Sequence, residues 1–122
     1  MKKKILIVDQ NEDFRKFTKS NLEQKGYEIL EASSAKDGLD MAVRNAIDLV
    51  MMDMWLPSRK RGIDTAQALR NTEKTKDLPI LFLTGSRQEA ETRDVAEMTK
   101  CGYISKPFDM KSLERKIEQC MK

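Results

Sequence analysis

Four side chains that can take part in phosphoryl chemistry stand at the ends of four short, strand-like segments. They are Asp9, Asp53, Thr84 and Lys106. Two carboxylates, a hydroxyl and a lysine suit phosphoryl transfer: a carboxylate acts as the nucleophile, a metal ion neutralises phosphate charge, and the other two groups contact the oxygens. The inference depends on all four together, because a single Asp at a strand end is usually a turn former or a helix cap.

The chain contains no histidine. This excludes Ser-His-Asp and Cys-His mechanisms, a histidine metal site and a phosphohistidine carrier. Any chemistry must therefore run on carboxylates, hydroxyls, lysines and a metal ion.

The elements that position these groups follow from short apolar runs separated by longer stretches of helical periodicity. We expect strands at 5–8, 27–30, 49–52, 80–83 and 103–105, and helices at 11–25, 34–46, 63–71, 88–100 and 110–121. Gly26 takes the favoured place just past a helix end, and Ser34 with Asp37 resembles a capping box. The segment 57–62 is expected to be a loop.

Strands that alternate with helices predict an α/β fold, with a parallel sheet covered by helices on both faces. Strands buried on both faces have continuous apolar runs, as in Ile5-Leu6-Ile7-Val8. Ligands of such sheets bind beyond the carboxyl ends of the strands, so the four groups are expected to converge on one edge. We expect a single domain over residues 1–122, with no output domain.

Composition is that of an ordinary soluble protein, with 35% charged and 39% hydrophobic residues. The net charge of +3 gives no support to a nucleic-acid partner. The apolar run 5–8 is far too short for a signal peptide or a membrane span. We therefore expect a cytoplasmic protein without a membrane partner, in which Cys101 and Cys120 are buried or free thiols.

Four blocks of sequence carry a resemblance to a known family. They are ILIVD (5–9), DLVMMDMWLP (48–57), LPILFLTG (78–85) and YISKPF (103–108). In this order, over essentially the whole chain, they resemble the receiver domains of two-component response regulators, of the single-domain chemotaxis type. The resemblance implies a flavodoxin-like doubly wound sheet of five parallel strands, in the order 2-1-3-4-5, with five helices.

The resemblance also implies a role for each matched residue of the site. Asp53 would accept the phosphoryl group. The acidic Asp9, Asp53 itself and the backbone carbonyl of Trp55 would hold Mg²⁺. Thr84 would hydrogen-bond the phosphoryl group, and Lys106 would pair with it.

A switch and a set of partners follow from the same resemblance. Tyr103 would turn inward when Thr84 moves toward the phosphoryl group, which changes the surface of the last strand and helix. The phosphoryl donor would be a sensor histidine kinase or a histidine phosphotransfer protein. The changed surface would meet a downstream target or form a homodimer. The Lys106-Pro107 peptide bond is expected to be cis.

Two features depart from the family pattern. The family usually has a second acidic residue directly after the first, and here that residue is Gln10. Its side chain offers only a neutral oxygen, so it is expected to be a weak Mg²⁺ ligand. The basic loop Ser58-Arg59-Lys60-Arg61 is also one residue longer than usual.

Two other interpretations remain. Gln10 favours a pseudo-receiver, in which the same fold acts as a phosphorylation-independent interaction module. A flavodoxin-like redox protein would share the architecture, but the acidic segment 9–13 would repel a flavin phosphate. Apart from self-catalysed phosphoryl transfer and autodephosphorylation, we expect no enzymatic activity.

Overall fold

The computed structural model describes residues 2–85, 88, 91–99 and 101–121, and in this part of the chain a five-stranded parallel sheet forms the centre. Its strands are β1 (Lys4–Val8), β2 (Glu28–Ala32), β3 (Leu49–Asp53), β6 (Ile80–Thr84) and β7 (Tyr103–Ser105). They are ordered β2-β1-β3-β6-β7 across the sheet. Counted along the chain, this is the predicted order 2-1-3-4-5.

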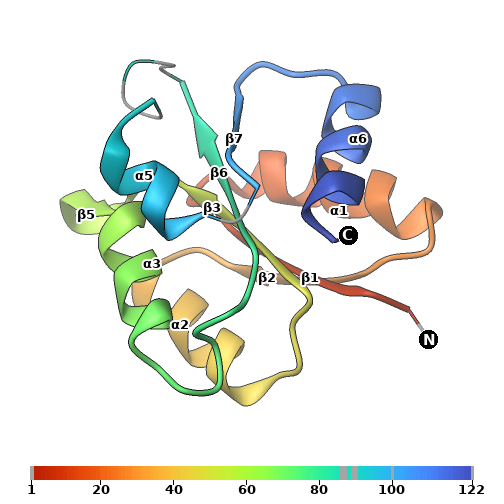
Figure 1. Cartoon of the computed structure of the whole chain (residues 1–122). Coiled ribbons are helices and arrows are strands. Elements are labelled where there is room, and N and C mark those ends of the chain that lie inside the picture. Colours follow the sequence, from red (N-terminus) through yellow and green to blue (C-terminus); the bar gives the residue numbers. More distant parts are fainter. Residues whose placement is uncertain (1, 86–87, 89–90, 100, 122) are drawn as a thin grey trace.

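Helices cover both faces of the sheet. They are α1 (Glu12–Gln24), α2 (Ala35–Arg44), α3 (Gly62–Arg70), α5 (Arg93–Met98) and α6 (Met110–Cys120). Figure 1 shows α1 and α6 on one face, with α2, α3 and α5 on the other. The doubly wound α/β prediction is confirmed. None of the helices in the described residues combines the length and the apolar character needed to cross a membrane.

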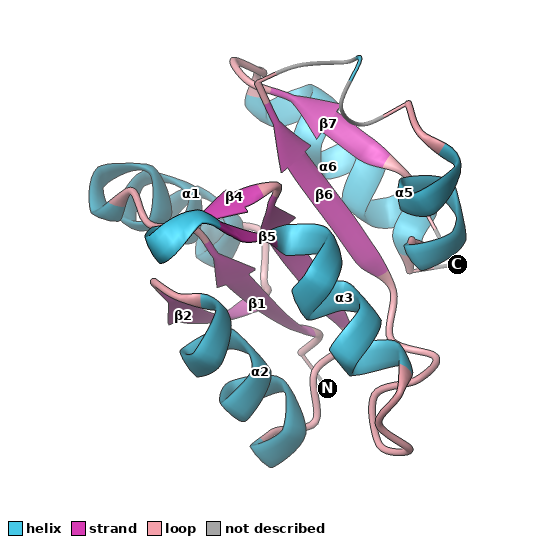
Figure 2. Cartoon of the chain, turned by 90° about the vertical axis from the view of Figure 1, so that its left-hand side faces the viewer, coloured by secondary structure: helices cyan, strands magenta, loops and turns pink. Residues whose placement is uncertain are grey.

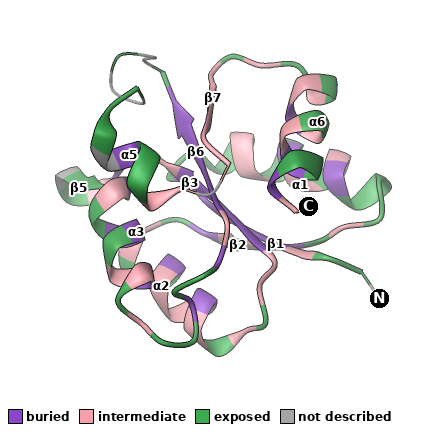
Figure 3. Ribbon diagram, in the orientation of Figure 1, coloured by how far each residue is buried: buried purple, intermediate pink, exposed green. Residues whose placement is uncertain are grey.

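Each face of the sheet has its own apolar core, and the central strands supply both. Met52 packs with the α2 and α3 side, whereas its neighbour Met51 packs with Leu113 of α6. Successive side chains of a strand point to opposite faces, so a continuous apolar run fills both cores at once. The buried residues in Figure 3 accordingly follow the central strands, while the outer faces of the helices are exposed.

Local capping sets the starts of the first two helices. The Asn11 side chain accepts a hydrogen bond from the Phe14 backbone N–H at 2.9 Å, and that of Ser34 accepts one from Asp37 N–H at 3.2 Å. Gly26, with φ +95°, takes the left-handed conformation just after α1. The predicted positions of these helix ends are confirmed.

The prediction of a simple loop at 57–62 is wrong. The chain instead forms a small antiparallel hairpin of β4 (Trp55–Leu56) and β5 (Lys60–Arg61), joined by the 3₁₀ turn η1 (Pro57–Arg59) (Figure 2). Two local features explain it. Leu56 is buried, and Ser58 adopts a left-handed conformation with φ 64°, which lets the chain reverse.

The single helix predicted at 88–100 is wrong in part, because Gln88 is helical, residues 91–92 form a bend, and α5 starts at Arg93. The Thr92 side chain accepts a hydrogen bond from the Val95 backbone N–H at 3.2 Å, and this cap fixes the start. Thr99 has an extended backbone with ψ 154°, which ends the helix at Met98. Residues 89–90 and 100 of the prediction lie outside the described residues.

The prediction of free or buried thiols is also wrong, because Cys101 and Cys120 form a disulfide. Their Cα atoms are 4.9 Å apart although 19 positions separate them in sequence. The turn before β7 meets the last turn of α6, since both elements pack into the same core. Sequence spacing alone does not reveal such a tertiary contact.

Gly62 links the sheet to the start of α3. Its backbone N–H donates to Met54 O at 2.7 Å, and a Cβ atom on Gly62 would lie 2.2 Å from Asp53 O. No real Cβ atom approaches a carbonyl oxygen so closely. The absence of a side chain at Gly62 therefore lets α3 begin directly against the end of β3.

We predict that Gly62→Ala lowers the free energy of unfolding by about 1–3 kcal/mol, because the new methyl group displaces backbone. The matched control is Gly85→Ala, where a Cβ atom would meet nothing within 4 Å. Urea denaturation of both variants measures the difference. An equal effect of the two substitutions would contradict the packing argument.

Candidate active site

The carboxyl ends of four neighbouring strands bring the predicted groups to one edge of the sheet. Asp9 directly follows β1, Asp53 ends β3, Thr84 ends β6, and Lys106 directly follows β7. Val8 is in register with Met52, which sets the next residues of β1 and β3 beside each other. The Lys106 backbone N–H donates to Thr84 O at 2.7 Å, which extends the β6–β7 pairing to the lysine.

Lys106 is the cation of the site. Its Nζ lies 2.6 Å from Asp9 Oδ2 and 4.0 Å from Asp53 Oδ2. The same ammonium stands 4.1 Å from the centre of the Phe14 ring, which packs edge-on against Phe108 at 5.9 Å. A cation–π contact and an ion pair thus fix the ammonium beside both carboxylates. The predicted cis conformation of the Lys106-Pro107 bond is confirmed.

Asp9 is almost fully buried, with 1% of its surface exposed. One carboxylate oxygen accepts the Asn11 backbone N–H at 2.9 Å, and the other accepts Lys106. Arg15 supports it from behind, because Nη1 donates to the Asp9 carbonyl at 2.6 Å while Nε donates to Glu31 at 3.1 Å. Sequence reasoning missed Arg15, whose only signal is a cation six positions after Asp9 on a helix.

Asp53 is the acidic residue of the site whose pKa is raised. Burial raises the pKa of this carboxyl above its ordinary value, and the charge of Asp9 raises it further. Lys106 and the backbone N–H groups of Trp55 and Met54 offset only part of the increase. The contact to Trp55 is 3.2 Å, to Oδ1. Asp53 therefore lies where its negative charge is poorly compensated.

This charge deficit fits a divalent cation. Mg²⁺ in proteins is usually bound by one or two carboxylates together with waters and substrate phosphate. The Asp9 and Asp53 pair meets that requirement, although no cluster of three or more Asp, Glu, His or Cys that could hold a metal occurs in the described ranges. Gln10 is exposed and contributes no charge.

Thr84 and Tyr103 lie near the site but take no part in the Lys106 ion pairs. Thr84 is buried at the end of β6. The Tyr103 hydroxyl donates to Glu91 Oε1 at 2.6 Å, and its ring contacts the core on the α2 and α3 side. In this structure Tyr103 is therefore bonded to the segment before α5.

An apolar groove of about 380 Å³ borders the site on the α1 side. It is lined by Phe14, Phe17, Thr18, Lys106, Pro107, Phe108 and Met110. Phe17 is 63% exposed, which is unusual for a large apolar side chain. Because Lys106 lines the groove and also lies near both carboxylates, the groove adjoins the carboxylate site.

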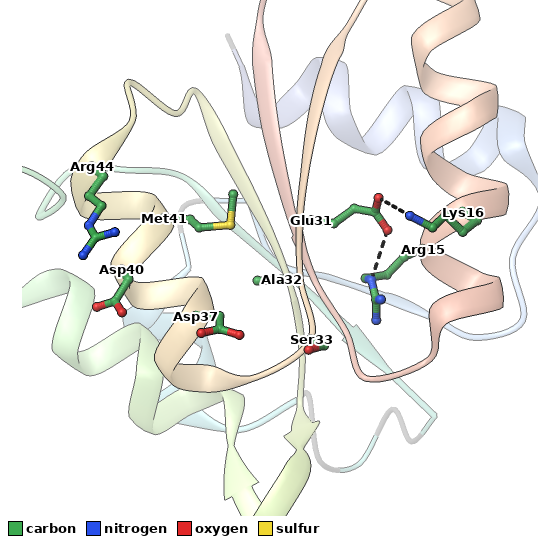
Figure 4. Close-up of a pocket in the computed structure, with 9 residues that line it drawn as sticks. All are labelled: Arg15, Lys16, Glu31, Ala32, Ser33, Asp37, Asp40, Met41 and Arg44. Carbon is green, nitrogen blue, oxygen red and sulfur yellow. Dashed lines mark hydrogen bonds and ion pairs between the residues drawn. The ribbon is translucent and has the colours of Figure 1, made fainter.

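A second hollow, of about 370 Å³, lies between α1 and α2 at the end of β2 (Figure 4). Glu31 contacts Lys16 and Arg15 on one side, and Asp37, Asp40 and Arg44 lie on the other. Neither Asp53 nor Lys106 lines it. It is therefore separate from the carboxylate site, although Arg15 links the two.

Comparisons with known proteins agree with this arrangement. The chain is 33% identical to the phosphate regulon transcriptional regulatory protein PhoB of Pseudomonas aeruginosa, over 98% of this chain and 52% of PhoB. It is 32% identical to the transcriptional regulatory protein CpxR of Escherichia coli, over 98% of this chain and 49% of CpxR. The chain thus spans about half the length of these curated relatives.

Solved structures show the same fold. The chemotaxis response regulator CheY4 of Vibrio cholerae superimposes with a TM-score of 0.90 at 24% identity, over 98% of this chain and 99% of CheY4. A receiver domain protein of Methanospirillum hungatei gives 0.88 at 26% identity, over 99% and 94%. The family model of the response regulator receiver domain matches residues 5–118, so the chain belongs to the response regulator receiver domain family.

Proposed function

We propose that this chain is a phosphoacceptor switch, which takes a phosphoryl group on Asp53 and changes its binding surface. Receiver domains are signalling switches that interact with histidine kinases and downstream effectors. The observation that carries the proposal is the partly buried Asp53 carboxylate, which lies beside Asp9 with Lys106 Nζ at 4.0 Å. The donor would be a histidine kinase or a histidine phosphotransfer protein, and the location cytoplasmic.

In the transfer step, an Asp53 carboxylate oxygen would attack the phosphorus of a phosphohistidine. The P–O bond forms as the P–N bond breaks, and the ring, already protonated on its other nitrogen in the phosphohistidine, leaves as neutral imidazole. Lys106 would contact one phosphoryl oxygen and the Thr84 hydroxyl another. The proposal includes no catalysis beyond this self-catalysed transfer and the later loss of the phosphoryl group.

Magnesium is part of this proposal, as the divalent cation that the two carboxylates would bind. The solved receiver domain of the sensor histidine kinase PA1611 from Pseudomonas aeruginosa holds a magnesium ion in its active site cleft. In this chain Asp9, Asp53 and the backbone carbonyl of Trp55 would hold Mg²⁺, with Gln10 as a weak ligand. The bound ion would neutralise the negative charge of the phosphoryl oxygens.

The donor protein must cover the rim around Asp53. The apolar groove begins at Lys106 and ends in the exposed Phe17 of α1. Apolar side chains of the donor could bury this surface while its phosphohistidine reaches Asp53. We therefore place the donor on the α1 side of the site.

The output side, by which we mean the surface that changes on phosphorylation, would consist of β7 and α6. Movement of Thr84 toward the phosphoryl group would free space for Tyr103, which would then exchange its hydrogen bond to Glu91 for an inward position. A downstream target or a second copy of the chain would bind one of the two states better, which shifts the population. The hydrogen bond of 2.6 Å supports an outward resting state.

A pseudo-receiver remains the second candidate, and Gln10 is the observation in its favour. With an uncharged residue at this position, only the carboxylates of Asp9 and Asp53 would supply negative charge to a bound cation. In a pseudo-receiver the same surfaces would bind partners without any phosphoryl transfer. Labelling of Asp53 separates the two candidates.

We predict that acetyl phosphate with Mg²⁺ adds one phosphoryl group to the chain, and that Asp53→Asn abolishes the addition. Intact mass measurement detects it. The matched control is Asp37→Asn, which removes an exposed carboxylate from α2. Labelling that persists in Asp53→Asn would refute the acceptor assignment, and absence of labelling in the parent chain would favour the pseudo-receiver.

Gln10→Asp should tighten Mg²⁺ binding about tenfold or more, since it places a full negative charge next to the ion. Fluorescence of the single tryptophan, Trp55, can follow the titration. Gln24→Asp adds the same charge at the far end of α1 and should leave the affinity unchanged. Equal affinities of the parent and Gln10→Asp would show that position 10 does not contact the ion.

The raised pKa of Asp53 predicts a pH-dependent stability in the absence of metal. The folded protein holds this proton more tightly than the unfolded chain, so the stability contributed by Asp53 is present below its ordinary pKa of 3.8 and is lost as the pH rises through the folded-state value. Asp53→Asn should therefore be more stable than the parent at pH 7 in EDTA, with the gain vanishing at low pH.

A second substitution, Asp109→Asn, should change the stability at neutral pH in the opposite direction. The Ser112 backbone N–H lowers the pKa of Asp109, so Asp109→Asn should lose stability at neutral pH and not at low pH. Thermal denaturation across the pH range measures both variants. Parallel pH profiles of Asp53→Asn and the parent would contradict the charge deficit at Asp53.

A further inference from the structure

The disulfide closes the whole output side into one covalent ring. The ring runs from Cys101, just before β7, to Cys120 in the last turn of α6. It contains Tyr103 and Lys106, which are the residues proposed for the switch and for contact with the phosphoryl group. Any motion of β7 against α6 must therefore occur within a closed loop.

One end of this ring is anchored to the sheet. The Thr99 hydroxyl donates to Ile80 O of β6 and accepts the backbone N–H groups of Cys101 at 3.0 Å and Gly102 at 2.7 Å. The Phe82 backbone N–H in turn donates to Gly102 O at 3.1 Å. Because this turn is fixed to β6, the disulfide fixes the last turn of α6 to the sheet as well.

Without the disulfide, α6 is held mainly by its apolar face. Leu113 and Ile117 are fully buried, and Glu114 makes a long ion pair of 3.8 Å with Lys25. Apolar contacts of this kind restrain small shifts or rotations of a helix less than a covalent bond at its end does. The oxidation state of the pair therefore decides how freely α6 can respond.

We propose that Cys101 and Cys120 form a redox clamp, which as a disulfide holds β7 and α6 in the unphosphorylated arrangement and as two thiols releases them. The clamp rests on the proposed function, since it acts on the switch described there. It adds an oxidation signal to the phosphorylation signal. Disulfides of reducing compartments are typically transient and redox-sensing.

The exposure of the two cysteine residues suggests the order in which they react. Cys101 is partly exposed, whereas Cys120 has 6% of its surface exposed. Lys116 Nζ lies 3.6 Å from the point where a Cβ atom of Gly102 would stand, so a cation lies beside this turn. Reactive cysteines typically occupy such electropositive, partly exposed positions.

Oxidation would proceed by thiol–disulfide exchange with a low-molecular-weight disulfide. The Cys101 thiolate attacks one sulfur of this oxidant and releases one thiol, leaving a mixed disulfide. The Cys120 thiolate then attacks Cys101 and releases the second thiol. The protein loses two electrons and two protons, and the oxidant is reduced to two thiols.

The test uses the full chain, oxidised with oxidised glutathione or reduced with a phosphine, with each state verified by intact mass under non-reducing conditions. Both forms are treated with acetyl phosphate and Mg²⁺, and hydrogen exchange is measured by mass spectrometry. We expect both forms to be labelled. Phosphorylation should speed amide exchange in β7 and α6 about tenfold in the reduced form and leave it unchanged in the oxidised form.

Cys101→Ser and Cys120→Ser provide the controls, because each should behave as the reduced form even after oxidant. If either variant folds poorly, the two redox states of the parent chain still give the comparison. Failure of the disulfide to form, or an equal response to phosphorylation in both states, would overturn the clamp.

Absence of labelling in the reduced form would contradict the proposed phosphoacceptor function without contradicting the clamp. In that case the exchange rates of the unphosphorylated protein still test the clamp. Slower exchange of α6 in the oxidised form supports it, and identical exchange in the two redox states overturns it.

Discussion

The ion pair between Lys106 and Asp9 joins the end of the last strand to the end of the first, across 97 positions of sequence. The rest of the site is arranged around it. Phe14 supports the ammonium, and Arg15 holds the Asp9 backbone from the other side. Since Lys106 is closer to Asp9 than to Asp53, the charge of the second carboxylate is compensated only in part. That imbalance fits the divalent cation included in the proposed function.

The residues of the site contact the helical layers on both faces of the sheet, through different side chains on each face. On one face, Gly62 sets the start of α3 against the Asp53 carbonyl. On the other, the ring of Phe14 and the side chain of Phe108 connect Lys106 to α1 and α6. Asp53 and its neighbour Lys106 are therefore in packing contact with helices or their flanking residues on both faces of the sheet. The position of the site residues therefore depends on the helices as well as on the strands.

Much of the fold and the set of strand-end groups could be predicted, because both depend on local signals. Continuous apolar runs mark doubly covered strands, and parallel strands place their last residues at one edge. Arg15 could not be assigned, since its partners are a backbone carbonyl and Glu31, which lies on another strand. The disulfide likewise depends on how the turn before β7 meets α6. The hairpin at Trp55 depends on the left-handed conformation of Ser58, a residue type that does not usually adopt it.

The two border strands of the sheet also protect the protein from association through its backbone. The β7 border has only three residues, which is too short to template another chain effectively. The β2 border carries Glu28 and Glu31, and Arg15 and Lys16 hold Glu31 in place from α1. An incoming strand would have to approach charged side chains on one border and find almost no open backbone on the other. The short β7 and the charged β2 thereby disfavour edge-to-edge pairing of the sheet with another strand.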